Sequence, residues 1–202
     1  MVRAEELMKY ENALLSEGCR YVCGVDEVGR GPLAGPVTCA AVIMPLDDLI
    51  QGVNDSKKVS KGKREKLSAL IREKAVAYSV VSYDNVRVDE MNILEATKAC
   101  MRDAVCSLSV KPDAVLVDAL RIDVPFRVVP LVHGDALSYS IAAASILAKV
   151  ERDAFMSAIA EKYPQYGFER NVGYGTAEHI AALKEFGPTE IHRRTFIKNF
   201  VK

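Results

Sequence analysis

An acidic pair inside an apolar segment is the feature that most restricts how this chain can fold. Asp26 and Glu27 follow the mostly apolar residues 21–25 and precede a Gly-Arg-Gly turn at residues 29–31. Neighbouring side chains on a strand point to opposite faces, so a strand through this segment directs one carboxylate toward the core. A buried carboxylate needs a compensating charge, and hard divalent cations prefer oxygen ligands. The pair therefore predicts a metal site at the end of a strand.

The Gly-Arg-Gly turn places a guanidinium and accessible backbone amides beside that site. Arg30 can face an anionic substrate, while Gly29 and Gly31 leave the backbone uncovered. Acids and a cationic turn together indicate a metal-dependent enzyme that acts on phosphodiesters. The segment also fits the loose dinucleotide-binding pattern Gly-x-Gly-x-x-Ala, but that pattern has to open a helix. Pro36 and a β-rich segment follow instead, and two acids upstream would repel a pyrophosphate.

Length and charge are those of an ordinary globular protein. The 202 residues suffice for one domain with a buried core and a small appendage. Because 27 basic and 27 acidic residues cancel, any binding to nucleic acid has to be local. Basic residues cluster within 57–66 and again from His192 onward, and both segments are candidate phosphate contacts.

Cysteine use and hydropathy predict the compartment. The cysteines are odd in number and form no Cys-x-x-Cys pair, which argues against a zinc site and a disulfide framework; they are Cys19, Cys23, Cys39, Cys100 and Cys106. The N-terminus has early glutamates and no long apolar run, and no segment approaches the roughly 20 apolar residues of a membrane span. We therefore expect a cytoplasmic protein without membrane contact, and a monomer as the default state.

Periodicity predicts a mixed α/β fold. Strands are expected over residues 21–28, 37–44, 76–82, 114–117 and 126–132, with the first two forming an antiparallel hairpin. Helices are expected over residues 3–16, 55–73, 89–108, 138–161 and 176–186. Asp89 is the expected N-cap of the third helix, and either Ser138 or Ser140 that of the fourth. Strand ends that carry Asp118 and Asp135 can converge with the acidic pair on one edge of the sheet.

Within these helices, apolar residues at helical spacing predict the buried faces. Leu94, Met101, Val105 and Leu108 repeat along the third helix, and Ile141, Ala144, Ala148, Phe155 and Ile159 along the fourth. Asp153 lies off that stripe with Lys149 one turn earlier, which predicts a solvated ion pair. The histidines His133, His179 and His192 are scattered, and we expect structural or phosphate contacts from them rather than general bases.

A series of segments in this order resembles the type 2 ribonuclease H family (bacterial ribonuclease HII). They are residues 24–37, 55–58, 92–94, 117–118, 134–135, 143–150, 163–168, 173–176 and 192–196. The resemblance implies a ribonuclease H-like mixed sheet flanked by helices, with a catalytic domain over residues 1–163. A small helical C-terminal cap over residues 164–202 would bind substrate. The implied activity is endonucleolytic cleavage of the RNA strand of RNA–DNA hybrids, and cleavage 5′ of single ribonucleotides in duplex DNA, with Mg²⁺ or Mn²⁺ as cofactor.

The resemblance assigns metal binding and catalysis to Asp26, Glu27, Asp118 and Asp135. Two metal ions about 4 Å apart can activate a water and stabilise the leaving oxygen of an in-line displacement. The residues alone leave simpler alternatives open. Asp26 and Glu27 would then be a turn acid and an exposed glutamate, Asp118 an Asx-turn, and Asp135 part of the cap of the following helix.

Substrate contacts follow from the same resemblance. The turn at 29–31 would recognise the ribose, whose 2′-hydroxyl distinguishes RNA from DNA. Tyr174 would pack on the sugar at the junction between ribonucleotide and deoxyribonucleotide, and Lys57 and Arg193 would bind phosphates. The alternatives are a tyrosine in the core of the cap and cations on a solvated face.

Two positions depart from the family pattern. Val172 stands where many relatives carry lysine, so we expect one phosphate contact fewer. Ala119 stands where glycine or serine is common, and its small size predicts no loss. A module that binds nucleic acid without cutting it is the competing hypothesis, which the four intact acids argue against. The chain also lacks a Walker A sequence.

Overall fold

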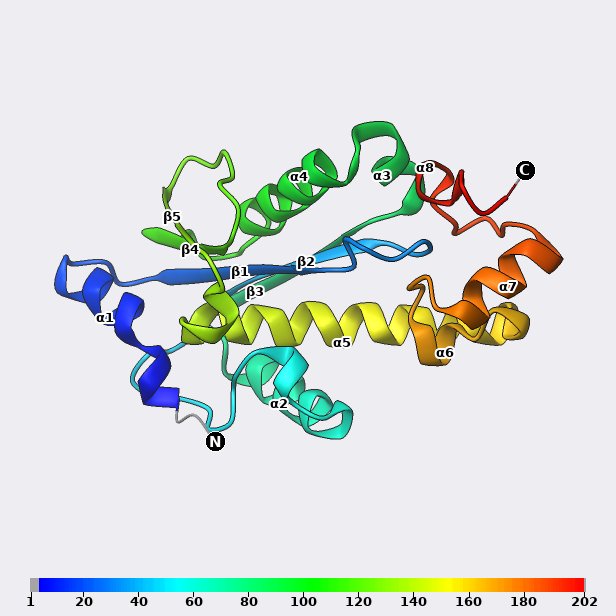
Figure 1. Ribbon diagram of the computed structural model, residues 1–202. Helices are drawn as coiled ribbons and strands as arrows, with labels where there is room; N and C mark the ends of the chain where they lie inside the picture. Colours follow the sequence, from blue (N-terminus) through cyan, green and yellow to red (C-terminus); the bar gives the residue numbers. More distant parts are fainter. Residues whose placement is uncertain (1–3, 202) are drawn as a thin grey trace.

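A mixed five-stranded sheet organises residues 4–201, the part of the chain that the computed structural model describes (Figure 1). The strands are β1 Val22–Val28, β2 Val37–Ile43, β3 Ala77–Tyr83, β4 Ala114–Asp118 and β5 Arg127–Leu131. Their order in the sheet is β3-β2-β1-β4-β5. β1 and β2 pair antiparallel, as do β2 and β3, whereas β4 is parallel to both β1 and β5. The mixed sheet and the opening hairpin are therefore confirmed.

Helices cover both faces of this sheet (Figure 1). The α-helices are α1 Lys9–Ser16, α2 Lys61–Lys74, α3 Asn85–Met91, α4 Ile93–Cys106, α5 Tyr139–Lys162, α6 Phe168–Asn171, α7 Ala177–Phe186 and α8 Arg194–Ile197. Single 3₁₀ turns are η1 Ala4–Leu7, η2 Ser56–Lys58, η3 Gly134–Ala136 and η4 Pro164–Tyr166. Cys23 and Val25 of β1 pack with α4 in one core cluster. The opposite face of the sheet packs on α5, with α2 beside it.

Gly24 allows α5 to cross β1 in close contact. A Cβ atom added at Gly24 would lie 2.0 Å from the backbone carbon of Ser140, so no other residue fits without moving the helix. Ser138 is the N-cap and accepts a hydrogen bond from the Ile141 amide. Buried Glu11 of α1 accepts hydrogen bonds from Ser138 Oγ and the Ser140 amide. The start of α5 is thus fixed against both α1 and the sheet.

The predicted helix over residues 89–108 is wrong at its start. Asn92 ends α3 and begins α4, with a φ of 65° and a side chain that accepts hydrogen bonds from the amides of Leu94 and Glu95. Asp89 instead accepts hydrogen bonds from the backbone amides of Arg194 and Thr195. Leu94 is exposed rather than buried, because the buried face of α4 begins one turn later.

Two expectations for α5 are also wrong. Phe155 is 42% exposed, since the second half of this helix extends beyond the sheet toward α6 and α7 (Figure 1). Asp153 does pair with Lys149, but its side chain is only 15% exposed and also faces Arg64 of α2. That pair is therefore largely buried and not solvated.

The segments η4, α6 and α7 gather at the far end of α5, whereas α8 lies beside α3 (Figure 1). Met156 and Ala160 of α5 share a small core cluster with Tyr166, Phe168 and Ile191. The predicted helix over 176–186 is confirmed, with Thr176 as its N-cap. Among residues 4–201, no helix combines the length and apolar character that crossing a membrane requires.

Candidate active site

The register of the parallel strands brings the first three acids together. Val25 of β1 pairs with Val117 of β4, so the next residues, Asp26 near the end of β1 and Asp118 at the end of β4, lie side by side. With Glu27, they present carboxylate oxygens that all lie within 4.8 Å of one another. Asp26 is only 5% exposed. Three of the predicted acids thus form one compact group.

Asp135 lies outside that group of three, in η3 just before α5. The Gly134 amide donates to Asp118 Oδ1 at 2.6 Å, which ties this turn to the end of β4. Lys57 Nζ lies 3.6 Å from Asp135 Oδ2. Burial first, and then the charge of Asp55 and that of Asp118, raise the pKa of Asp135. Asp135 is therefore electrostatically part of the same acidic site.

Asp55 is a site residue that the sequence analysis did not single out. Its carboxylate is near enough to Asp135 to raise the pKa of that residue, and it accepts a hydrogen bond from the Lys57 amide at 2.9 Å. The available signal was its position directly before Ser-Lys-Lys in a segment that matches the family pattern. The basic residues that follow it predict phosphate binding, and no role was predicted for Asp55 itself.

Asp26 and Glu27 also lie where too little positive charge balances their carboxylates. Burial, followed by the charges of Glu27 and Asp118, raises the pKa of Asp26 well above its ordinary value. Burial raises the pKa of Glu27 as well, although the Arg30 guanidinium, 3.6 Å from Glu27 Oε1, acts in the opposite direction. Glu27 Oε2 is buried and has no hydrogen-bond partner within residues 4–201. An oxygen-only group with one buried oxygen left over fits a hard divalent cation.

Arg193 does not lie where a phosphate contact requires it. The side chain is fully buried, and its guanidinium donates to the backbone carbonyls of Gly29, Arg30 and Gly35 at 2.6–3.0 Å. We correct the expectation accordingly: Arg193 shapes the Gly-Arg-Gly turn from behind. An arginine in a basic tail gives no sign in the sequence that it will be buried.

Arg152 of α5 is a second buried arginine behind this turn, and the sequence analysis missed it. It donates to the carbonyls of Pro36 at 2.9 Å, Ala34 at 3.2 Å and Val172 at 2.8 Å. It therefore connects the loop after the Gly-Arg-Gly turn with the segment that leads to Tyr174. Fully buried charges are rare unless hydrogen-bonded, and here backbone carbonyls supply the bonds.

Tyr174 lies beside the turn, half-exposed. A Cβ atom added at Gly31 would meet Tyr174 Cε1 at 3.5 Å, which is ordinary contact distance. The Tyr174 carbonyl bonds to His179 Nδ1 at 2.8 Å, and His179 Nε2 lies 3.0 Å from His192 Nε2. These two histidines are therefore paired and buried rather than scattered, and their role is structural.

Comparison with known proteins identifies relatives of this chain in sequence and in structure. The sequence profile of ribonuclease HII matches residues 23–199. The chain is 51% identical to ribonuclease HII of Ruminiclostridium cellulolyticum, covering all of this chain and 80% of that one. It is 52% identical to ribonuclease HII of Shouchella clausii, covering 95% and 74% of the two chains. The crystal structure of ribonuclease H2 from Pyrococcus horikoshii OT3 superposes with a TM-score of 0.75 at 29% identity, covering 87% of this chain and 93% of that one. Profile, sequence and architecture agree, and the chain belongs to the ribonuclease HII family.

Proposed function

We propose that this chain cuts duplex DNA on the 5′ side of single embedded ribonucleotides. This goes beyond the metal-dependent endoribonuclease activity on RNA–DNA hybrids that its family membership gives. The observation that carries the proposal is the fixed Gly-Arg-Gly turn beside the acids, with Tyr174 against Gly31. A turn whose carbonyls are held by a buried arginine is suited to recognising one 2′-hydroxyl within DNA.

In this proposal Asp26, Glu27, Asp118 and Asp135 hold Mg²⁺ or Mn²⁺. Two such ions supply an activated water and stabilisation of the leaving 3′-oxygen. The acids themselves act as ligands, and none of them forms a covalent intermediate. Arg30, beside Glu27, would balance the charge of the cut phosphate.

The substrate contacts divide between two parts of the chain. Residues 1–163 would form the catalytic domain, in which Gly29 and Gly31 face the ribose and Lys57 reaches a phosphate. Residues 164–202 would form the substrate-binding cap, in which Tyr174 packs on the sugar at the junction. Support comes from the exposure of Tyr174, which is 43% for the residue, and from that of the Lys57 side chain, which is 83%.

The test is cleavage of a labelled DNA duplex that contains one ribonucleotide, with Mg²⁺, with Mn²⁺ and with chelator. An all-DNA duplex and a long RNA–DNA hybrid serve as controls. A metal-dependent cut 5′ of the ribonucleotide supports the proposal, and the ratio of the two metals shows which is preferred. Cleavage of the hybrid alone would remove junction recognition by Arg30 and Tyr174. Binding without any cleavage would favour a non-cutting nucleic-acid-binding module.

Asp118→Asn tests the metal site within the same assay. We expect cleavage to fall by about 1,000-fold or more while the circular dichroism spectrum is unchanged, because one ligand of the metal site is lost. Full activity in this variant would exclude Asp118 from the metal site.

We also propose that the protein is a cytoplasmic monomer. All five cysteines are free, as a reducing compartment requires. Light scattering of the purified protein measures its mass directly, and a dimer would contradict the proposal.

A further inference from the structure

The segment that carries Lys57 is attached to α5 along one row of side chains. Ser145, Lys149 and Asp153 are spaced four residues apart and so share one face of this helix. Ser145 Oγ hydrogen-bonds to Ser56 Oγ at 2.8 Å, directly before Lys57. Lys149 Nζ lies 2.8 Å from Asp153 Oδ1 and completes the row.

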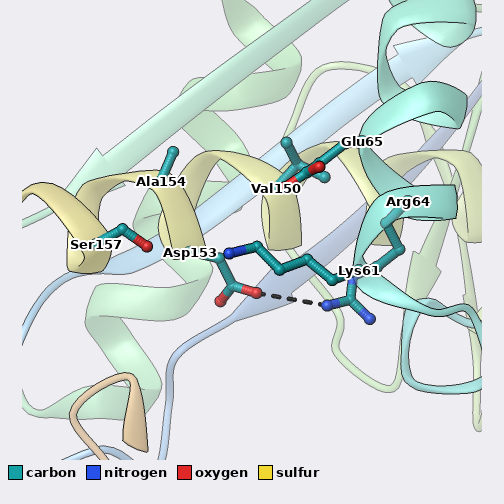
Figure 2. Close-up of a pocket in the computed structure, with 7 residues that line it drawn as sticks. All are labelled: Lys61, Arg64, Glu65, Val150, Asp153, Ala154 and Ser157. Atoms are coloured by element: carbon teal, nitrogen blue, oxygen red, sulfur yellow. Dashed lines mark ion pairs between the residues drawn. The ribbon is translucent and has the colours of Figure 1, made fainter. Parts of the chain in front are cut away.

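Arg64 of α2 connects this row to the backbone on both sides of Lys57. Its Nη1 donates to the carbonyls of Ser56 at 3.1 Å and Val59 at 2.5 Å. Its Nη2 lies 3.6 Å from Asp153 Oδ2, and Figure 2 shows Asp153 of α5 directed at Arg64 of α2. The side chains of Arg64 and Asp153 are 14% and 15% exposed, so solvent screens their attraction less than that of a surface pair.

We propose that Asp153 and Arg64 are positioning residues that hold Lys57 toward Asp135 and the substrate phosphate. The inference rests on the proposed function, because it concerns the same site. Lys57 is highly exposed, so few side-chain contacts limit its direction and the backbone of residues 56–59 has to set it. A misplacement of about 1 Å far from the chemistry can cost an enzyme about a hundredfold in rate.

Asp153→Asn tests this role, and Glu151→Gln is its matched control. Glu151 of α5 also pairs with an arginine of α2, Arg72, at 2.8 Å, but Arg72 stacks on the Tyr78 ring and not on the Lys57 segment. In the assay above, we expect Asp153→Asn to lower kcat/KM about five- to tenfold, in the range of coupling between neighbouring residues. Glu151→Gln should change kcat/KM less than about twofold, as an exposed pair contributes little.

A double-mutant cycle with Lys57→Ala separates positioning from a general loss of structure. If Asp153 acts through Lys57, Asp153→Asn costs less than about twofold once Lys57 is already alanine. An equal loss in both backgrounds would overturn the inference. Thermal melting shows whether each variant is folded at the assay temperature. If Asp153→Asn is not, Arg64→Met replaces it in the cycle, since it removes the guanidinium and keeps an apolar side chain in place of the arginine stem.

The outcomes also separate this inference from the proposed function. Failure of the unmodified protein to cut the ribonucleotide duplex would refute the proposed function itself. Normal cutting that depends on Lys57 but not on Asp153 or Arg64 would refute only the positioning role. If Lys57→Ala does not change normal cutting, the positioning role is refuted as well.

Discussion

Two residues without the freedom of glycine hold left-handed backbone conformations near the site. Ala119 has a φ of 53° directly after Asp118, and Val172 has a φ of 43° directly before Gly173. The small size of Ala119 predicts no loss, but its backbone torsion angle is strained, at a cost of about 1 kcal/mol. The expected loss of a phosphate contact at Val172 stays a prediction. What the structure adds is that the Val172 carbonyl accepts a hydrogen bond from buried Arg152.

Ala119→Gly should stabilise the protein by about 0.5 kcal/mol, since glycine adopts this conformation freely but loses more entropy on folding. Urea unfolding monitored by circular dichroism measures the change. Ala154→Gly, at an exposed position inside α5, is the control and should cost about 1 kcal/mol. A loss of stability at position 119 would mean that the strain at alanine is smaller than the entropy that glycine loses on folding.

Asp26→Asn should abolish cleavage and yet stabilise the metal-free protein. Because burial and neighbouring acids raise the folded-state pKa of Asp26, the folded protein binds more protons than the unfolded chain. Stability without metal therefore falls as pH rises from about 4 toward that raised pKa. At about pH 7.5 in chelator, the asparagine variant should be more stable by an amount on the order of 1 kcal/mol. The two proteins should converge near pH 4, and calorimetry across this range would show a constant gap if the reasoning is wrong.

At the scale of elements, the contact between β1 and α5 holds the acids in place. Gly24→Ala should destabilise the protein by about 3 kcal/mol or more, because the added methyl group meets backbone atoms of Ser140 that cannot rotate away. Gly62→Ala is the matched control: nothing lies within 4 Å of a Cβ at that position in α2, and alanine should stabilise the helix by up to about 1 kcal/mol. Equal melting temperatures for the two variants would contradict this assignment.

Strands were predictable from the sequence to within a few residues, and helix boundaries less well. Apolar segments with strand propensity mark β1, β2 and β4 directly, and Ser138 caps α5 as one of two expected residues. The start of α4 was not predictable, because Asp89 and Asn92 are both good N-caps. The choice depends on Asp89 binding the amides of Arg194 and Thr195, more than a hundred residues away.

At the scale of the whole molecule, two neutral histidines connect the segments around Tyr174 and Thr189. The Tyr174 carbonyl can only accept, so His179 Nδ1 carries a proton and Nε2 is an acceptor. His192 Nε2 therefore donates to His179, which leaves His192 Nδ1 to accept from the Thr189 amide at 2.9 Å. A second proton on either ring breaks this chain of hydrogen bonds between Thr189 and Tyr174.

These hydrogen bonds through His179 and His192 predict that the protein loses stability in acid. Burial, and then the nearness of His179, lower the pKa of His192 from 6.5 to about 4, and burial lowers that of His179. The unfolded chain takes up protons first, so the stabilisation is complete above about pH 6.5 and is lost as pH falls toward 4. We expect the two histidines to contribute a loss of about 2 kcal/mol across this window, measured as the difference in urea unfolding between the unmodified protein and His192→Asn. His192→Asn should be less stable at pH 7 and should flatten this dependence; an unchanged pH slope would exclude the histidine pair as its cause.

The candidate site was partly predictable because its acids stand at recognisable places. Asp26 and Glu27 lie near the end of β1 and Asp118 ends β4, and the strand register brings them together. Asp55 could not be predicted as a site residue, because its place there depends on η2 folding back against η3. The buried arginines and the histidine pair depend on contacts between distant segments, for which charge and periodicity give no local signal.

The hydrogen bonds from Arg193 to the Gly29–Gly31 turn join an early and a late part of the chain, so the turn gains this partner only near the end of synthesis. Arg193 follows Gly29 by 164 residues along the chain, whereas all four acids precede it by dozens of positions. A growing or truncated chain that stops short of Arg193 therefore carries all four acids but lacks the guanidinium that holds the turn. The shape of the turn thus depends on one of the last residues to be synthesised.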